Sequence, residues 1–324
     1  MLDDPADERP RIVIDESSFG FQGAGLVDIS LSFNAFAGAL EALLLHEGRQ
    51  VCISDLLYDQ PCLGTDVATV LFSSDSPAVS LGLDHDIRLR VGRLLDRCCS
   101  WTSFSDFVAR DVRIDGERID VGSSLSFAVE MALRRHNMAC LVLDLASRRG
   151  FRQVSADEKL AEVFFFAEAA AMTTFWRELF SREGVDEGNF FNLARDAFQS
   201  LLFAEHLSFR HFAGSYLELR DSVVKALGVL NDHFAGAHAA GKGIPYDVQA
   251  RLGGLGLDVS PESPGTRGSG KLRSHRLVTF EGREYWCEWH IKIERHRNRI
   301  HFALPDSTLG GRILIGIFTT HLPT

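Results

Sequence analysis

The sequence lacks the patterns that most readily assign a function. Its six cysteines include no C-x-x-C pair, which argues against a zinc or thioredoxin-type site and favours reduced thiols over a disulfide framework. It also contains no Gly-x-x-x-x-Gly-Lys-Ser/Thr loop, no His-Glu-x-x-His and no Gly-x-Ser-x-Gly. These absences argue against a phosphate-loop nucleotide site and against the standard zinc-protease and serine-hydrolase templates.

A long apolar run and a cationic leader are also absent. The most apolar stretch, residues 163–172, is interrupted by Glu168 and is shorter than the roughly 18–20 apolar residues that cross a bilayer. The first ten residues are acidic rather than basic, unlike a secretion signal. We therefore expect a cytoplasmic protein without a membrane partner.

Length and charge suggest several packed parts. The 324 residues exceed the roughly 250–300 residues at which one hydrophobic core usually stops growing. From Lys271 to the end there are nine basic and five acidic residues, a net charge of +4, so a total of −10 leaves −14 for the preceding 270 residues. This asymmetry fits a basic module that meets nucleic acid, or one that docks on its own acidic neighbour.

Hydrophobic periodicity predicts an α+β protein. Residues 1–154 resemble an α/β domain, with a parallel sheet as one arrangement of its strands. An Asp115-Gly116 turn favours a hairpin over 112–121. The other expected elements of this domain are strands at 11–14, 51–53 and 139–145 and helices at 32–46, 83–96 and 124–136.

Residues 155–257 form an expected Phe-rich helical domain, because twelve phenylalanines lie between Phe164 and Phe234, mostly at helical spacing. They predict either an aromatic core or, in part, an interface for a protein partner. The expected helices span 161–182, 189–205, 216–240 and 246–252. Residues 258–274, rich in Pro, Gly and Ser, are the expected linker, and residues 275–324 the expected small antiparallel β-module.

Two alternating segments, 285–294 and 297–302, carry the candidate site. Strand periodicity places Trp289 and Ile291 on one face and His290 and Lys292 on the other. The second segment places His301 on its polar side in the same way. Two neighbouring strands therefore predict a solvent-exposed sheet face that carries histidines and cations.

The mixture of side chains on this face suits a phosphodiester. Arginine pairs bidentately with phosphate and lysine adds a point charge, so the predicted phosphate-binding residues are Lys292, Arg297 and Arg299. Histidine titrates near neutrality and can move a ribose proton. The predicted catalytic residues are His290, His301 and His321.

Two other interpretations of this face were weighed. His296 joins the three histidines above as a potential metal ligand, but the neighbouring cations would repel a metal ion, so we expect no metal and no cofactor. Alternatively, Glu288 and Glu294 neutralise Arg299 and Arg297, and the face is only a salt-bridged surface. The sequence leaves this interpretation and phosphate binding open.

The last forty residues resemble a family of ribonucleases. Residues 297–302, followed after a gap by 313–321, are similar to the final two strands of RelE- and HigB-type toxins, which carry an Arg-Ile-x-Phe motif and end in Tyr-His. The resemblance implies that Arg299 binds phosphate and that His321 takes the place of the terminal histidine. Thr320 stands where those toxins usually have tyrosine, and they lack a large acidic region before this module.

A second acidic group follows the first strands of the chain. Asp15 and Glu16 end the first strand, and Asp55 and Asp59 follow the next, where open α/β sheets place ligand-binding groups. This arrangement resembles a PIN-type nuclease domain, in which clustered carboxylates hold Mg²⁺ or Mn²⁺. The alternative is a set of turn carboxylates beside a serine helix cap, and the sequence does not decide between them.

These observations predict a bacterial protein that binds nucleic acid, with RNA expected as the partner ahead of DNA. The predicted activity is that of a metal-independent endoribonuclease of toxin–antitoxin or antiphage-defence type, working through the C-terminal His/Arg face. The alternative function is a non-catalytic scaffold of a protein complex that uses the Phe-rich helices as its interface.

Overall fold

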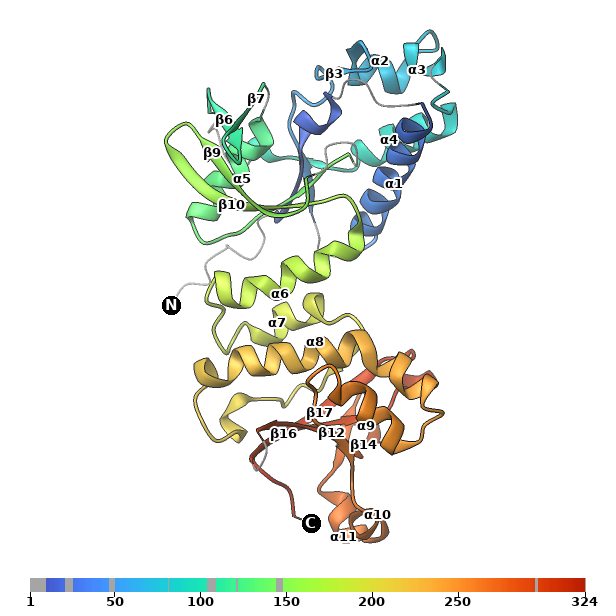
Figure 1. Cartoon of the computed structure of the whole chain (residues 1–324), viewed down its shortest axis with the longest axis vertical. Coiled ribbons are helices and arrows are strands. Elements are labelled where there is room, and N and C mark those ends of the chain that lie inside the picture. Colours follow the sequence, from blue (N-terminus) through green and yellow to red (C-terminus); the bar gives the residue numbers. More distant parts are fainter. Residues whose placement is uncertain are drawn as a thin grey trace. The chain divides into compact units, whose positions relative to one another are not determined.

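The computed structural model describes residues 10–20, 26–46, 50–80, 82–103, 109–120, 122–143, 148–294 and 297–323. The chain divides into two compact units, Met1–Phe175 and Trp176–Thr324 (Figure 1). The boundary falls inside helix α6 (Met172–Arg182).

An eight-stranded mixed sheet forms the centre of the N-terminal unit, in the order β5-β2-β1-β8-β10-β9-β6-β7. The first five strands in this order run parallel to their neighbours, and the rest pair antiparallel. The parallel strands are β1 (Ile12–Ile14), β2 (Val51–Ile53), β5 (Cys99–Ser100), β8 (Ala139–Leu141) and β10 (Lys159–Phe166). The antiparallel strands are β6 (Val112–Ile114), β7 (Glu117–Ile119) and β9 (Gly150–Ala156).

Helices complete this unit, and its core is apolar on both faces of the parallel strands. Val13, Cys140 and Phe165 are cross-strand partners on one face, and Ile14, Leu141 and Phe166 on the other. All six are fully buried, as expected where helices cover a parallel sheet. The main helices are α1 (Leu26–Leu44), α4 (His85–Leu95) and α5 (Ser123–Leu133), with shorter helices η2 (Glu16–Phe19), α2 (Val67–Phe72), α3 (Pro77–Ser80), η3 (Trp101–Ser103) and η5 (Ala169–Ala171). A two-stranded ribbon pairs β3 (Pro61–Cys62) with β4 (Thr65–Asp66).

The structure confirms the mixed α+β class and most of the expected elements of this unit. The hairpin at 112–121 is present as β6 and β7, and Asp115 and Gly116 adopt φ of 50° and 88° at its turn. Residues 144–147, the end of one expected strand, lie outside the described residues. The helix expected from residue 161 is wrong, because 159–166 form β10 and α6 begins at Met172. Pairing with β8 and β9 on its two sides fixes this apolar run as a buried strand.

The cysteines differ from the sequence expectation. Cys52 and Cys99 face each other across β2 and β5 and are joined by a disulfide. The prediction of reduced thiols missed this pair because 47 residues separate its members in sequence. Cys62, Cys98, Cys140 and Cys287 are free.

A five-stranded sheet organises the C-terminal unit, in the order β11-β17-β16-β15-β12. All its pairs are antiparallel except β11 with β17. Its strands are β11 (Leu201–Phe203), β12 (Val259–Pro261), β15 (Trp289–Glu294), β16 (Arg297–Ala303) and β17 (Ile313–Thr319), and a separate hairpin pairs β13 (Leu277–Phe280) with β14 (Arg283–Trp286). The helices are α7 (Phe190–Ala197), η6 (Phe209–His211), α8 (Tyr216–Ala240), α9 (Pro245–Gly253), α10 (Pro264–Gly268), α11 (Gly270–Ser274) and η7 (Ser307–Leu309).

Helix α8 covers the apolar face of this sheet. The Phe234 ring contacts Trp289 and Phe302 edge-on, with centroids 5.7 and 5.1 Å apart. Both residues lie on the apolar side predicted from the alternation. The opposite side of β15 and β16 therefore carries the polar residues of the candidate site.

Two expected boundaries differ from the structure. Residues 201–203, expected as helix, form β11 and pair with β17, so the Phe-rich helices share one compact unit with the C-terminal sheet. The expected linker 258–274 is folded into β12, α10 and α11. Two of the four serines in this stretch are helix caps: Ser263 Oγ accepts from Thr266 N, and Ser269 Oγ from Leu272 N.

The twelve phenylalanines between 164 and 234 belong mainly to the two cores. Eleven of them are buried, and Phe191 is half-buried. This supports the aromatic-core interpretation rather than an exposed aromatic interface. None of the helices in the described part of the chain is both long and apolar enough to span a membrane.

Candidate functional site

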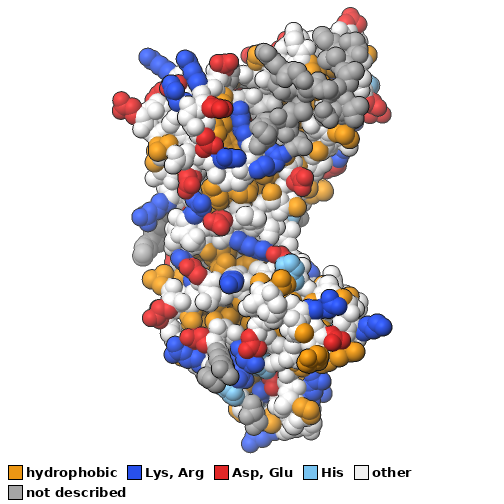
Figure 2. Space-filling model, in the orientation of Figure 1, with side chains coloured by type: hydrophobic (Ala, Val, Ile, Leu, Met, Phe, Trp, Pro, Cys, Tyr) orange, Lys and Arg blue, Asp and Glu red, His pale blue; other side chains and the backbone are white. Residues whose placement is uncertain are grey.

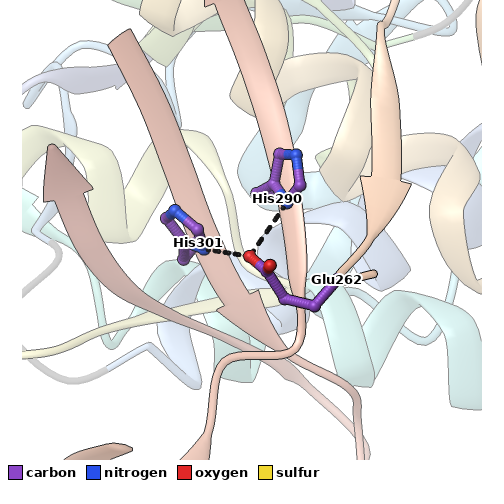
Figure 3. Close-up of side chains that lie close together, drawn as sticks. All are labelled: Glu262, His290 and His301. Carbon is purple, nitrogen blue, oxygen red and sulfur yellow. Dashed lines mark ion pairs between the residues drawn. The ribbon is translucent and has the colours of Figure 1, made fainter. Parts of the chain in front are cut away.

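Two of the predicted histidines lie side by side in the C-terminal sheet. His290 of β15 and His301 of β16 are direct cross-strand partners, so both rings project from the same face. Their centroids are 5.1 Å apart. Figure 3 shows the two rings converging on a third side chain, Glu262.

Glu262 reaches the histidines from the residue after β12. Its backbone N–H donates to Glu288 O at 2.8 Å, which anchors it at the edge of the sheet. Its Oε1 lies 3.3 Å from His290 Nδ1 and 3.4 Å from His301 Nδ1. The guanidinium of Arg276 completes the group, with Nε 2.8 Å from the same oxygen.

This cluster is buried, which corrects the prediction of a solvent-exposed face. Arg276, His301 and Glu262 are 1%, 0% and 5% exposed. The expected continuous strand 285–294 is broken at residues 287–288, so the β13–β14 hairpin folds against the sheet instead of extending it. A Cβ added to Gly316 of β17 would lie 2.3 Å from Cys287 Sγ and 3.0 Å from Val278 Cγ2, which shows how closely this segment packs.

The environment sets the ionisation of the cluster. Burial lowers the pKa of His301 to about 3, and the nearby His290 adds to this effect. Burial raises the pKa of Glu262, but His290 and Arg276 outweigh it and hold that pKa at about 2. At neutral pH Glu262 is therefore an anion and His301 a neutral ring. A ring with this pKa does not suit the proton-transfer role predicted for His301.

Hydrogen bonding in the cluster is incomplete. Its buried atoms without a hydrogen-bond partner are Glu262 Oε1, Arg276 Nε, His290 Nδ1, and both ring nitrogens of His301. The other nitrogen of His290, Nε2, lies 3.2 Å from Ser260 Oγ. Four of these five atoms make the ion-pair contacts given above. The fifth, His301 Nε2, has neither kind of contact in the described part of the chain, although buried polar atoms are almost always hydrogen-bonded.

The predicted phosphate-binding residues lie near each other but are largely neutralised. Lys292 contacts Asp258 at 3.0 Å. Arg297 donates to both oxygens of Glu294, at 2.6 and 3.0 Å, as the salt-bridged interpretation predicted. The predicted pairing of Glu288 with Arg299 is not among the described contacts. Arg299 instead faces Lys292 across the strands, and its buried Nε lacks a hydrogen-bond partner.

His321 does not belong to the cluster. It follows β17, and its side chain is exposed, whereas the contacts of the buried group involve the other two predicted histidines. His296 lies outside the described residues. The structure thus brings together His290 and His301 and leaves His321 apart.

Sequence reasoning missed Glu262 and Arg276. Both lie in or beside stretches whose composition predicted a linker, and neither follows an alternating pattern. Only the pairing of β12 with β15 and the hydrogen bonds of Arg276 to Leu272 O and Pro323 O place them beside the histidines.

The acidic residues of the N-terminal unit have structural partners. Asp15 caps η2 by accepting from Ser17 N at 3.0 Å, and it forms an ion pair with Arg148. Glu16 is fully buried, and its Oε1 accepts from Ser124 N at 2.9 Å. Asp55 accepts from Ser100 Oγ at 2.7 Å. The turn-and-cap interpretation fits these contacts, with Asp15 rather than a serine as the cap.

Within the described ranges, the group of three or more His, Cys, Asp or Glu side chains that converge on a potential metal position is Glu262, His290 and His301. Their ligand atoms lie within 4.8 Å of one another. Comparison with protein-family models, curated proteins and solved structures gave no match.

Proposed function

We propose that this protein binds nucleic acid, RNA more readily than DNA, through a basic surface of its C-terminal unit. The observation that carries the proposal is an acid-free stretch in an acidic chain. From Ser263 to Phe280 the sequence has four basic residues and no Asp or Glu, whereas the whole chain has a net charge of −10. A local cationic surface of this kind is the usual electrostatic basis for phosphate binding.

Three cations of this stretch are exposed. Arg267 lies on α10, and Lys271 and Arg273 lie on α11. On the face drawn in Figure 2, by contrast, Lys and Arg side chains are interspersed with Asp and Glu over most of the surface. We name Arg267, Lys271 and Arg273 the basic knob.

An aromatic ring adjoins the basic knob. The Arg273 guanidinium lies over the Trp286 ring, 4.5 Å from its centroid, and Trp286 is half-buried. Arginine–aromatic pairs contribute to single-strand binding by stacking on bases. This combination favours a flexible single strand over a rigid duplex.

Arg299 offers a second phosphate contact. Like charges directly opposite each other across strands repel, and Lys292 faces Arg299 in this way. Asp258 neutralises only the lysine. A phosphate beside Arg299 would therefore relieve this repulsion.

Salt-dependent affinity of the whole chain for a single-stranded RNA probe tests the proposal. We expect log affinity to fall with log salt, by about 0.7 per phosphate contact. A variant with Arg267, Lys271 and Arg273 changed to Gln should lose about two units of that slope. The matched control changes Lys225, Lys242 and Arg251, exposed cations of the same unit, to Gln, and should bind like wild type. A flat salt dependence, or equal loss in both variants, would overturn the proposal.

The predicted ribonuclease activity and its toxin-like resemblance stay predictions. His290 and His301 are 6% and 0% exposed, so RNA cannot reach them without rearrangement of the residues packed around them. The scaffold alternative gains no support from the phenylalanines, because nearly all of them are in the cores.

A further inference from the structure

We infer that Glu262, His290 and His301 form a binding site for a divalent transition-metal ion of the zinc class. Carboxylate oxygen and imidazole nitrogen are common ligands of such ions. This site is separate from the basic knob, and it does not depend on nucleic-acid binding.

The two distances from Glu262 to the histidines match those between ligands of a tetrahedral ion. Two ligands that are each about 2.0–2.1 Å from a tetrahedral zinc lie about 3.3–3.4 Å apart. Glu262 Oε1 lies 3.3 and 3.4 Å from the Nδ1 atoms of His290 and His301. A solvent oxygen would complete four-coordination.

The unpaired atoms point to the same ligand. Glu262 Oε1 and both Nδ1 atoms make ion-pair contacts but no hydrogen bond, and a metal bound between them would give each of the three a direct ligand bond. Ser260 Oγ, 3.2 Å from His290 Nε2, stands where metal-binding histidines usually find a partner for their second nitrogen. The backbone pairing of β12, β15 and β16 holds the three ligands in position without the ion.

Two of the three neighbouring cations that argued against a metal in the sequence are compensated by carboxylates. Lys292 is compensated by Asp258 and Arg297 by Glu294. Two charges oppose the ion: Arg276, whose Nε is 2.8 Å from Glu262 Oε1, and Arg299, whose charge helps to lower the pKa of His301. The other nitrogens of Arg276 donate to Leu272 O and Pro323 O, so its guanidinium is held beside the ligands rather than among them.

Metal binding to the full-length chain, stripped with a chelator, tests the inference. We expect one Zn²⁺ per chain by calorimetry, a four-coordinate absorption spectrum with Co²⁺, and a higher unfolding temperature with Zn²⁺. Glu262→Gln and His290→Gln each remove a ligand, so each should weaken Zn²⁺ binding by more than the roughly 10–100-fold that loss of a ligand's hydrogen-bond partner typically causes. His233→Gln, which changes an exposed histidine on α8, is the matched control and should bind like wild type.

Arg276→Gln separates a metal site from a metal-free ion-pair network. Removing a positive charge beside the ligands should tighten Zn²⁺ binding by roughly tenfold or more. If the cluster is only a network, wild type and Arg276→Gln will both lack stoichiometric Zn²⁺ and Co²⁺ binding. That result, or Zn²⁺ binding that is unchanged in Glu262→Gln and His290→Gln, would overturn the inference. RNA affinity is measured separately, so either proposal can fail alone.

Discussion

Glu16 of the N-terminal unit and Glu262 of the C-terminal unit are both buried, yet their ionisation differs. Burial and the neighbouring Asp15 raise the pKa of Glu16 to about 7, and the hydrogen bonds with Ser124, which lower this pKa, only partly offset them. Burial also raises the pKa of Glu262, but His290 and Arg276 bring it to about 2. Burial thus raises the pKa of both glutamates, and the charges beside each one decide whether its final pKa lies above or below the ordinary value.

The partner of Glu16 is the end of a helix rather than a cation. Ser124 lies in the first turn of α5, whose N-cap residue Gly122 makes no side-chain cap bond, and Glu16 Oε1 accepts the Ser124 N–H. A carboxylate at a helix N-terminus is favourable, but typically by less than a buried ion pair provides. Glu16 therefore serves as a cap supplied from another element.

The largest expected effect comes from removing the cation beside Glu262. Arg276→Gln leaves a buried carboxylate without its guanidinium, so we expect the metal-free protein to lose about 3–5 kcal/mol of unfolding free energy. Denaturant unfolding measures this loss. The matched control is Arg297→Gln, which breaks an exposed ion pair and should cost at most about 1 kcal/mol. Equal effects of the two variants would show that burial does not distinguish the pairs.

The second-largest expected effect comes from the disulfide bond of the N-terminal unit. Cys52 and Cys99 enclose a long loop of the N-terminal unit, with a sequence separation of 47, and the chain-entropy model gives such a bond about 4 kcal/mol. Reduction, or Cys52→Ser, should lower the stability of this unit, with little effect on the C-terminal unit. Hydrogen exchange of each unit with and without reductant measures the difference. Cys62→Ser, at a free buried cysteine, separates loss of the disulfide from disturbance of the core.

The smallest expected effect is the pH dependence caused by Glu16. The folded-state pKa of Glu16 is raised from 4.5 to about 7. The stabilisation that the protonated side chain adds to the free energy of unfolding is therefore fully present below pH 4.5 and is lost as pH rises through about 7. The change is on the order of 3 kcal/mol. Glu16→Gln should remove this component, whereas Glu117→Gln, at an exposed site, should retain it. Unfolding free energies from pH 5 to 8 measure the effect, and identical pH profiles of wild type and Glu16→Gln would contradict it.

Local patterns predicted much of the fold. The hairpin around Asp115-Gly116, helix α8 and the alternation in β15 and β16 were correct because short-range backbone and side-chain preferences specify them. The strand β10 was mistaken for helix because an apolar run that is buried on both faces has no distinctive period. Residues 258–274 were mistaken for a linker because serine and proline favour helix starts as well as loops.

The sequence alone determined that His290 and His301 share one side of a sheet, since side chains alternate along every strand. Only the tertiary structure decided that this side is buried and that Glu262 and Arg276 meet the rings there. The physical reason is that alternation is a property of neighbouring residues, whereas burial depends on which distant segment covers a face. The same burial lowers the pKa of His301.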